Sequence, residues 1–195
     1  MSHYFSKNQN DVKHQIKVID FTYKNRQLTF KTDAGVFSKD HVDSASALLL
    51  NHVQLVQNQA VLDLGCGYGV IGIALATSTP LELTRVDVNE RAIDLAKENA
   101  EFNRVDADIF TSEGFDSVTK RFDHIISNPP IRIGKPALYQ LFKTAKAHLK
   151  SQGSLWLVMH KKHGALSAMT FLETLYKVSL VKRHKGFHVI RCETD

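Results

Sequence analysis

The chain has 195 residues, a hydrophobic content of 43% and a formal net charge of +5 at pH 7. This length suits one domain with a complete core, and the apolar content excludes a disordered chain. No stretch approaches the roughly 20 apolar residues of a membrane helix, and the amino terminus lacks the apolar core of a signal peptide. We therefore expect a folded, cytoplasmic protein that does not enter a membrane.

The cysteines and histidines do not predict a metal site or a disulfide framework. The two cysteines, Cys66 and Cys192, are far apart and lack the spacing of zinc ligands. The ten histidines are scattered along the chain. We expect no bound metal, and the sequence predicts no particular oligomeric state.

The first part of the chain is predicted to form an extension of the main domain. Residues 16–21 and 28–31 are short strand-like runs, and the segment between them, Tyr23-Lys24-Asn25-Arg26, is typical of a hairpin turn. Residues 43–53 carry an apolar stripe with helical spacing. We predict that residues 1–57 form a β-hairpin and a helix that pack on the remainder of the chain.

Residues 58–195 alternate between strand and helix patterns. The predicted strands are 60–64, 81–86, 107–110, 122–127, 154–159, 178–183 and 187–191. The predicted helices are 70–77, 90–103, 137–149 and 165–176. Repeated strand–helix units imply a doubly wound α/β fold with a mainly parallel sheet and right-handed crossovers. The last two strands should form an antiparallel hairpin at its edge.

A glycine-rich turn follows the first strand of this core, in the segment Leu62-Asp63-Leu64-Gly65-Cys66-Gly67-Tyr68-Gly69. Glycines permit positive φ and let the backbone approach a ligand closely, and the amides of the following helix can bind polar groups. Gly67, Gly69 and Gly72 also match the dinucleotide pattern, with Asp87 at about the right interval to hold a ribose. A nicotinamide cofactor is therefore one interpretation.

Asp63 favours a different ligand. It lies at the carboxyl end of a strand, where open α/β sheets bind their ligands. A carboxylate there suits a cation better than a pyrophosphate, and S-adenosylmethionine carries a sulfonium and an ammonium but no phosphate. The order of Asp63, the glycine turn, Asp87 and Asn128-Pro129-Pro130 is that of a class I methyltransferase.

The tripeptide Asn128-Pro129-Pro130 follows the apolar run 122–127. Two prolines cannot donate backbone hydrogen bonds and each fixes its φ, and the first moves Asn128 out of the helical region. The turn thus leaves carbonyl oxygens and a carboxamide available to hold a planar NH₂ group. We predict that Asn128, Pro129 and Pro130 are catalytic; an ordinary proline loop is the alternative.

These motifs resemble the "small" methyltransferase domain family, which includes the guanine-N2 methyltransferases of small-subunit ribosomal RNA. The resemblance is carried by Gly35-Val36-Phe37-Ser38, the glycine turn, Asp87-Val88-Asn89 and the segment from Asn128 to Lys135. The chain looks most like the compact single-domain members. The resemblance implies a seven-stranded class I fold and S-adenosylmethionine as the methyl donor.

The family also implies roles for individual residues. The implied cofactor-binding residues are Asp63, Gly65, Cys66, Gly67, Asp87, Val88, Asn89 and Glu113. By this resemblance, Asp63 and the first glycines line the methionine end, Asp87 accepts hydrogen bonds from the ribose, and Val88 and Asn89 lie against the adenine. Glu113 occupies the position from which relatives contact the adenine amine.

The expected substrate contacts are Phe37, Ile131, Arg132 and Lys135. Relatives commonly carry an aromatic residue at the position of Ile131, so Phe37 is expected to supply the stacking surface instead, unless it is simply a core residue. Arg132, Lys135, residues 161–163 and residues 182–185 could form a basic rim that contacts phosphates. The expected partner is ribosomal RNA or an assembling small ribosomal subunit.

Two other functions fit the same motifs. One is methylation of another planar amine or amide, such as a protein glutamine or a DNA adenine. The other is a non-catalytic RNA-binding module that assists assembly and merely retains the fold. The sequence favours an enzyme, because Asp63, Asp87 and Asn128 are all present.

Overall fold

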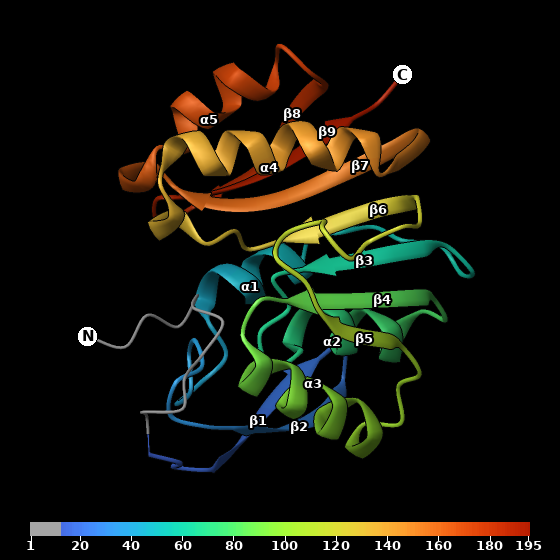
Figure 1. Ribbon diagram of the computed structural model, residues 1–195, viewed down its shortest axis with the longest axis vertical. Helices are drawn as coiled ribbons and strands as arrows, with labels where there is room; N and C mark the ends of the chain where they lie inside the picture. The colour runs from blue at the N-terminus through green and yellow to red at the C-terminus, as the bar shows by residue number, and fades with distance from the viewer. Residues whose placement is uncertain (1–12) are drawn as a thin grey trace.

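A seven-stranded sheet forms the centre of the computed structural model, which describes residues 13–195 (Figure 1). The first twelve residues of the predicted extension lie outside the described part. The strands are β3 (Ala60–Leu64), β4 (Glu82–Asp87), β5 (Asp108–Thr111), β6 (Phe122–Ser127), β7 (Leu149–His160), β8 (Lys177–His184) and β9 (Phe187–Glu193). Their order is β5-β4-β3-β6-β7-β9-β8, and β9 runs antiparallel to both of its neighbours. This order confirms the predicted doubly wound sheet and its terminal hairpin.

Helices cover both faces of the sheet (Figure 1). They are α1 (Ser44–Leu50), α2 (Val70–Ser78), α3 (Glu90–Phe102), α4 (Lys135–Ala147) and α5 (Ala165–Leu172). One core packs α1, α2 and α3 against Val61 and Trp156 of the sheet. A second core packs α4 and α5 against Leu62 and Leu155. Successive residues of a strand point to opposite faces, so the neighbours Val61 and Leu62 belong to different cores.

A separate two-stranded sheet, β1 (Lys17–Tyr23) and β2 (Arg26–Thr32), confirms the predicted amino-terminal hairpin. The connecting residues Lys24 and Asn25 have φ of 44° and 63°, as a two-residue turn of the mirror-image type requires. Asn99 of α3 accepts a hydrogen bond from the Lys31 amide (2.7 Å) and donates one to the Lys31 carbonyl (2.9 Å). The Asn99 side chain thus makes the pair of backbone hydrogen bonds that a neighbouring strand would make, and these bonds attach the hairpin to α3.

Helix α1 joins the extension to the main core. Leu49 and Leu50 are at most 1% exposed and pack in the same core as α2 and the sheet. The helix begins after Asp43, whose side chain accepts a hydrogen bond from the Ser46 amide and whose φ and ψ are −59° and 134°. The predicted boundaries of this helix, 43–53, are therefore too wide by a few residues. The division of the chain at residue 57 stays a prediction.

Two boundaries near α4 differ from the predicted ones. The helix begins at Lys135, two residues before the expected start, because Pro136 is tolerated in the first turn. The predicted helix exit at Gln152-Gly153 lies inside β7 instead. Here a Cβ on Gly153 would lie 2.8 Å from the Lys150 carbonyl oxygen, so only glycine fits this irregularity of the strand.

Helix α5 is also shorter than the predicted range 165–176, since it ends at Leu172. The chain then turns so that Tyr176 packs in the second core and its hydroxyl donates to the Phe142 carbonyl (2.8 Å). Among residues 13–195, none of the helices combines the length and the apolar character needed to cross a bilayer.

Candidate active site

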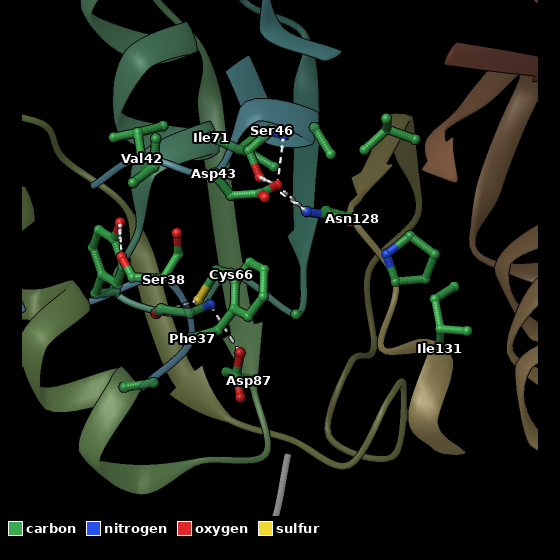
Figure 2. Close-up of a pocket in the computed structure, with 18 of the residues that line it drawn as sticks. Phe37, Ser38, Val42, Asp43, Ser46, Cys66, Ile71, Asp87, Asn128 and Ile131 are labelled. Atoms are coloured by element: carbon green, nitrogen blue, oxygen red, sulfur yellow. Dashed lines mark hydrogen bonds between the residues drawn. The ribbon is translucent and has the colours of Figure 1, made fainter. Parts of the chain in front are cut away.

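A cavity of about 460 Å³ opens at the carboxyl ends of β3, β4 and β6. Strand β3 lies between β4 on one side and β6 on the other, so the order of the strands reverses its direction at β3. Doubly wound sheets bind their ligands at this switch point. Ten of the predicted site residues line it: Phe37, Gly65, Cys66, Gly67, Asp87, Asn89, Asn128, Pro129, Ile131 and Arg132. Figure 2 shows the labelled members of this group.

The other five predicted site residues lie outside the cavity lining. Pro130 precedes a short turn of 3₁₀ helix, and the Lys135 ammonium lies 5.2 Å from the centre of the Tyr139 ring on α4. Glu113 is exposed in the loop after β5, and Val88 is partly buried beyond the end of β4. The ligand contacts assigned to these four residues stay predictions.

Asp63, the fifth, faces α2 rather than the cavity. Its carboxylate is 1% exposed, and Oδ2 accepts a hydrogen bond from the Gly72 amide (2.8 Å). Burial raises the pKa of Asp63 to about 6, and the positive charge of Arg85 and the Gly72 bond oppose that increase. Arg85 is the register partner of Asp63 on β4 and is itself fully buried. Asp63 therefore stabilises the first turn of α2 through its bond with the Gly72 amide. Its contact with a ligand stays a prediction.

The glycine turn between β3 and α2 has two kinds of position. Gly65 and Gly67 have φ of 72° and 55°, and a Cβ on either would meet nothing within 4 Å. These two positions therefore leave open space where the backbone borders the cavity. At Gly69, by contrast, φ is 106° and a Cβ would lie 1.5 Å from Nη2 of Arg85. Gly69 is required by packing, whereas Gly65 and Gly67 keep room for a ligand.

Asp87 presents a partly buried carboxylate to the cavity from the end of β4. Its Oδ2 accepts from the Gly67 amide (2.8 Å) and its Oδ1 from the Asn89 amide (2.9 Å). Burial raises the pKa of Asp87, and the backbone bonds from Asn89, Gly67 and Val88 oppose this change. A carboxylate offers about four lone-pair sites, so Asp87 can accept further hydrogen bonds from a ligand.

Asn128 has its amide group oriented by the protein (Figure 2). Nδ2 donates to Oδ2 of Asp43 (2.9 Å) and to Oγ of Ser46 (3.1 Å). An ionised carboxylate can only accept, which identifies the atom facing Asp43 as the nitrogen. Both amide hydrogens are thereby used. Within residues 13–195, neither Oδ1 of Asn128 nor the Pro129 carbonyl receives a hydrogen bond, so both acceptors are available at the cavity.

Asp43 and Ser46 also line the cavity and were not among the predicted site residues. Asp43 precedes the helical stripe of α1, a position that indicates an N-cap. That signal explains its bond to the Ser46 amide but not its contact with Asn128, which is 85 residues away in the sequence.

The loop that carries Phe37 is fastened to the site. The Tyr68 hydroxyl donates to the Ser38 carbonyl (3.1 Å), and Nδ2 of Asn89 donates to the Gly35 carbonyl (3.0 Å). Phe37 is 43% exposed, so it is not a core residue. Figure 2 shows Phe37 and Ile131 on opposite sides of the cavity, as two apolar walls between which a planar group can lie.

The described residues include neither a cluster of metal-ligating side chains nor a thiol of lowered pKa at the cavity. Residues 13–195 contain no group of three or more His, Cys, Asp or Glu that could hold a metal ion. Burial raises the pKa of the Cys66 thiol well above its usual value, which keeps the thiol protonated. Cys66 therefore serves as a small wall of the cavity.

The chain is similar to known methyltransferases in sequence and in fold. The profile of the methyltransferase small domain matches residues 27–191. The uncharacterized protein YbxB of Bacillus subtilis is 40% identical over 197 residues, which cover 98% of both chains. Ribosomal RNA small subunit methyltransferase C of Erwinia tasmaniensis is 40% identical over 141 residues, 70% of this chain, but the match covers only 41% of that relative.

A solved structure of similar fold is the T. thermophilus 16S rRNA N2 methyltransferase RsmC in complex with AdoMet and guanosine. It superposes with a TM-score of 0.84 at 27% identity, over 92% of this chain and 51% of that one. A methyltransferase from Pyrococcus furiosus, at 23% identity and a TM-score of 0.68, shares the fold.

Proposed function

Because the chain belongs to the methyltransferase small domain family, we propose that it transfers a methyl group from S-adenosylmethionine to the N2 amine of a guanine in small-subunit ribosomal RNA. The relatives named for methylation of small-subunit ribosomal RNA support the substrate. The observation that carries the proposal is the Asn128 carboxamide. Its two donors are bound to Asp43 and Ser46, and its acceptor is left for a ligand.

The residues of the cavity fit S-adenosylmethionine, which supplies an electrophilic methyl group on a sulfonium. Gly65 and Gly67 leave the space that the cofactor would fill, and Asp87 can accept hydrogen bonds from the ribose hydroxyls. Asp43 and Asp87 are the carboxylates of the lining. Two negative charges suit a cationic cofactor better than the pyrophosphate of a nicotinamide dinucleotide.

The amine of guanine is a poor nucleophile because its lone pair is delocalised into the ring. Oδ1 of Asn128 and the Pro129 carbonyl would accept its two N–H bonds and draw the nitrogen toward tetrahedral geometry. The lone pair would then point at the methyl group; transfer would leave a neutral thioether, and the methylated amine would lose one proton to water. This work is orientation and electrostatic stabilisation, for which preorganised acceptors suffice. Phe37 and Ile131 would hold the plane of the base.

Replacement of Asp87 by alanine should weaken cofactor binding about 100-fold or more, because two hydrogen bonds to a charged acceptor contribute roughly 1.5–3 kcal/mol each. Calorimetric titration with S-adenosylmethionine measures the effect. The matched control is Asp106→Ala, which removes an exposed carboxylate outside the cavity and should leave affinity unchanged. Equal affinities of the Asp87→Ala variant and the parent would contradict the role of Asp87.

The partner is assigned from a cluster of positive charge, here called the basic rim. It consists of Arg132, Lys135, Lys161, Lys162, Lys182, Arg183 and Lys185. Residues 161–162 and 182–185 of the rim lie on neighbouring segments. The Lys161 amide donates to the Gly186 carbonyl (2.8 Å), and the His160 and Phe187 rings lie 4.8 Å apart. His160, Phe187 and Arg132 all line the cavity. The rim thus borders one side of the site.

The charge of the chain is unevenly distributed. The segments 131–136, 160–166 and 182–188 contain the basic rim and have no Asp or Glu. The whole chain has 25 Lys and Arg against 20 Asp and Glu, so without the seven rim residues 18 cations remain against 20 acids. The seven rim cations thus outnumber the net excess of five, and their three segments include the cavity-lining residues Arg132, His160 and Phe187, past which the backbone of a bound RNA would run.

Removal of rim charges should reduce the salt dependence of RNA binding. For Lys161→Gln, Lys182→Gln and Lys185→Gln combined, we expect the slope of log K against log salt to fall by about 2, since each phosphate contact on a single strand contributes roughly 0.7. Filter binding of small-subunit ribosomal RNA at several salt concentrations measures this slope.

The matched control for the rim variant removes three exposed cations of the hairpin and α3 region, Lys24→Gln, Lys97→Gln and Arg104→Gln. The β1–β2 hairpin and α3 lie at the opposite end of the molecule from β8 and β9 (Figure 1), so the loss of these cations should leave the slope nearly unchanged. If both triple variants reduce the slope equally, the rim is not the RNA-binding surface.

Transfer of labelled methyl groups tests the proposed function itself. The purified protein is incubated with labelled S-adenosylmethionine and either small-subunit ribosomal RNA, ribosomal protein or DNA. We expect label in the RNA, and digestion should release it as N2-methylguanosine. Label in protein or DNA alone would assign the enzyme to another planar amine or amide. No transfer together with no cofactor binding would identify a non-catalytic module.

A further inference from the structure

The carboxamide at the centre of the site is held by the amino-terminal extension rather than by its own strand. Asp43 and Ser46 lie 85 and 82 residues before Asn128, yet they take both hydrogens of its Nδ2. We propose that Asp43 is a positioning residue, which fixes the Asn128 carboxamide with its oxygen toward the methyl-accepting amine. This inference rests on the proposed function and adds a residue to its machinery.

The chemistry of Asp43 gives the amide one orientation. Oxygen and nitrogen of a carboxamide have nearly the same shape, so only the partners decide which atom faces the substrate. A carboxylate accepts and cannot donate, so it binds the NH₂ end and rejects the oxygen. The Ser46 hydroxyl donates to Oδ2 of Asp43 (3.4 Å), which leaves an Oγ lone pair for the second hydrogen of Asn128. The reversed amide would place its oxygen against a negative charge.

Asp43 is itself held in place by α1. Its Oδ2 also accepts from the Ser46 amide (3.0 Å), as the N-cap of the helix. The far end of α1 is anchored by Leu49 and Leu50, which are almost completely buried in the core. Helix, cap and carboxamide therefore form one rigid unit, so the acceptor of Asn128 is oriented before any ligand binds.

The bond to Asp43 also strengthens the acceptor. A carboxamide whose N–H donates to an anion carries more negative charge on its oxygen, because linked hydrogen bonds polarise one another. Positive charge develops on the amine as it gains the methyl group. The Asp43 carboxylate accepts a hydrogen bond from the NH₂ group of Asn128. Through the polarised amide, its negative charge should stabilise the positive charge that develops on the amine.

Two substitutions separate positioning from helix capping. Asp43→Ser keeps a preferred N-cap residue, but its side chain is too short to reach Asn128. Asp43→Asn can keep both the cap and the bond from Asn128 through a single oxygen, because Oδ2 of Asp43 accepts both bonds, but it removes the negative charge that polarises the Asn128 amide. We expect Asp43→Ser to lower kcat by a factor between ~10 and ~100. The upper value is the loss in rate that a misplaced catalytic group can cause. Asp43→Asn should lie between it and the parent.

Two further readouts distinguish positioning from structural damage. Thermal unfolding of Asp43→Ser should match the parent, because serine keeps a preferred N-cap side chain. In the free protein, the side-chain amide hydrogens of Asn128 should exchange slowly in the parent and rapidly in Asp43→Ser, as measured by NMR. If Asp43→Ser unfolds, Asp43→Asn still tests the proposal, because it retains every bond of the cap.

A double-mutant cycle decides the inference. In the Asn128→Ala background, Asp43→Ser should have no further effect on kcat, because the group it positions is gone. An equal loss in both backgrounds would show that Asp43 acts elsewhere and would overturn the inference. An Asp43→Ser variant as active as the parent, with Asn128→Ala inactive, would overturn it as well. Full activity of Asn128→Ala alone would instead refute the proposed function.

Discussion

Replacement of Asn128 by alanine is expected to lower methyl transfer at least 100-fold and to leave cofactor affinity nearly unchanged. The loss corresponds to ~3 kcal/mol, the amount that one preorganised hydrogen-bond partner contributes to a transition state. In the proposed reaction Asn128 supplies the acceptor for the amine, and it lies across the cavity from Asp87, which is assigned to the cofactor (Figure 2). Rate and affinity should therefore respond separately.

The measurement combines single-turnover transfer to RNA with calorimetric titration of S-adenosylmethionine. Asn51→Ala provides the control, since Asn51 is an exposed asparagine at the other end of α1 whose capping bonds come from its backbone. Its rate should equal that of the parent. A parental rate in Asn128→Ala, or a loss explained entirely by weaker cofactor binding, would contradict the proposed role of the carboxamide.

Gly69→Ala is expected to reduce the free energy of unfolding by about 3 kcal/mol, which combines backbone strain with overpacking. The position has a φ of 106°, and the added Cβ would lie 1.5 Å from Nη2 of Arg85. Arg85 is completely buried, so its guanidinium cannot move into solvent without opening the packing between β4 and α2. For a chain of this length, such a loss lowers Tm by about 10 °C.

Gly65→Ala is the matched comparison in the same turn. Its φ is 72°, but no atom lies within 4 Å of the added Cβ, so we expect only the ~1 kcal/mol of left-handed backbone strain. The same Cβ would occupy space bordering the cavity and should weaken S-adenosylmethionine binding. Chemical denaturation of both variants checks the order. Equal losses of stability would show that Arg85 does not constrain Gly69.

Much of this architecture is predictable from local patterns. The alternation of apolar strands and amphipathic helices gives the sheet, and the glycines after β3 give the turn that borders the cavity. Asn128-Pro129 ends a buried strand, and the stiffness of its turn follows from the prolines alone. These features depend on neighbours in the sequence, which is why the pattern suffices.

The contacts between distant segments are not predictable in this way. Asp63 at the end of β3 could face a ligand or the helix above it, and its burial against α2 depends on Arg85 from the next strand. The bond from Asn128 to Asp43 depends on how α1 packs across the sheet. Such pairings appear only when the chain is folded, since no local pattern relates residues 85 positions apart.

Mass spectrometry of small-subunit ribosomal RNA, from cells with and without this gene, tests the central claim most directly. We predict that one N2-methylguanosine disappears when the gene is deleted. It should return with the parental protein and not with Asn128→Ala. An unchanged set of N2-methylguanosines in the deletion strain, or full restoration by Asn128→Ala, would contradict a carboxamide-dependent transfer to guanine.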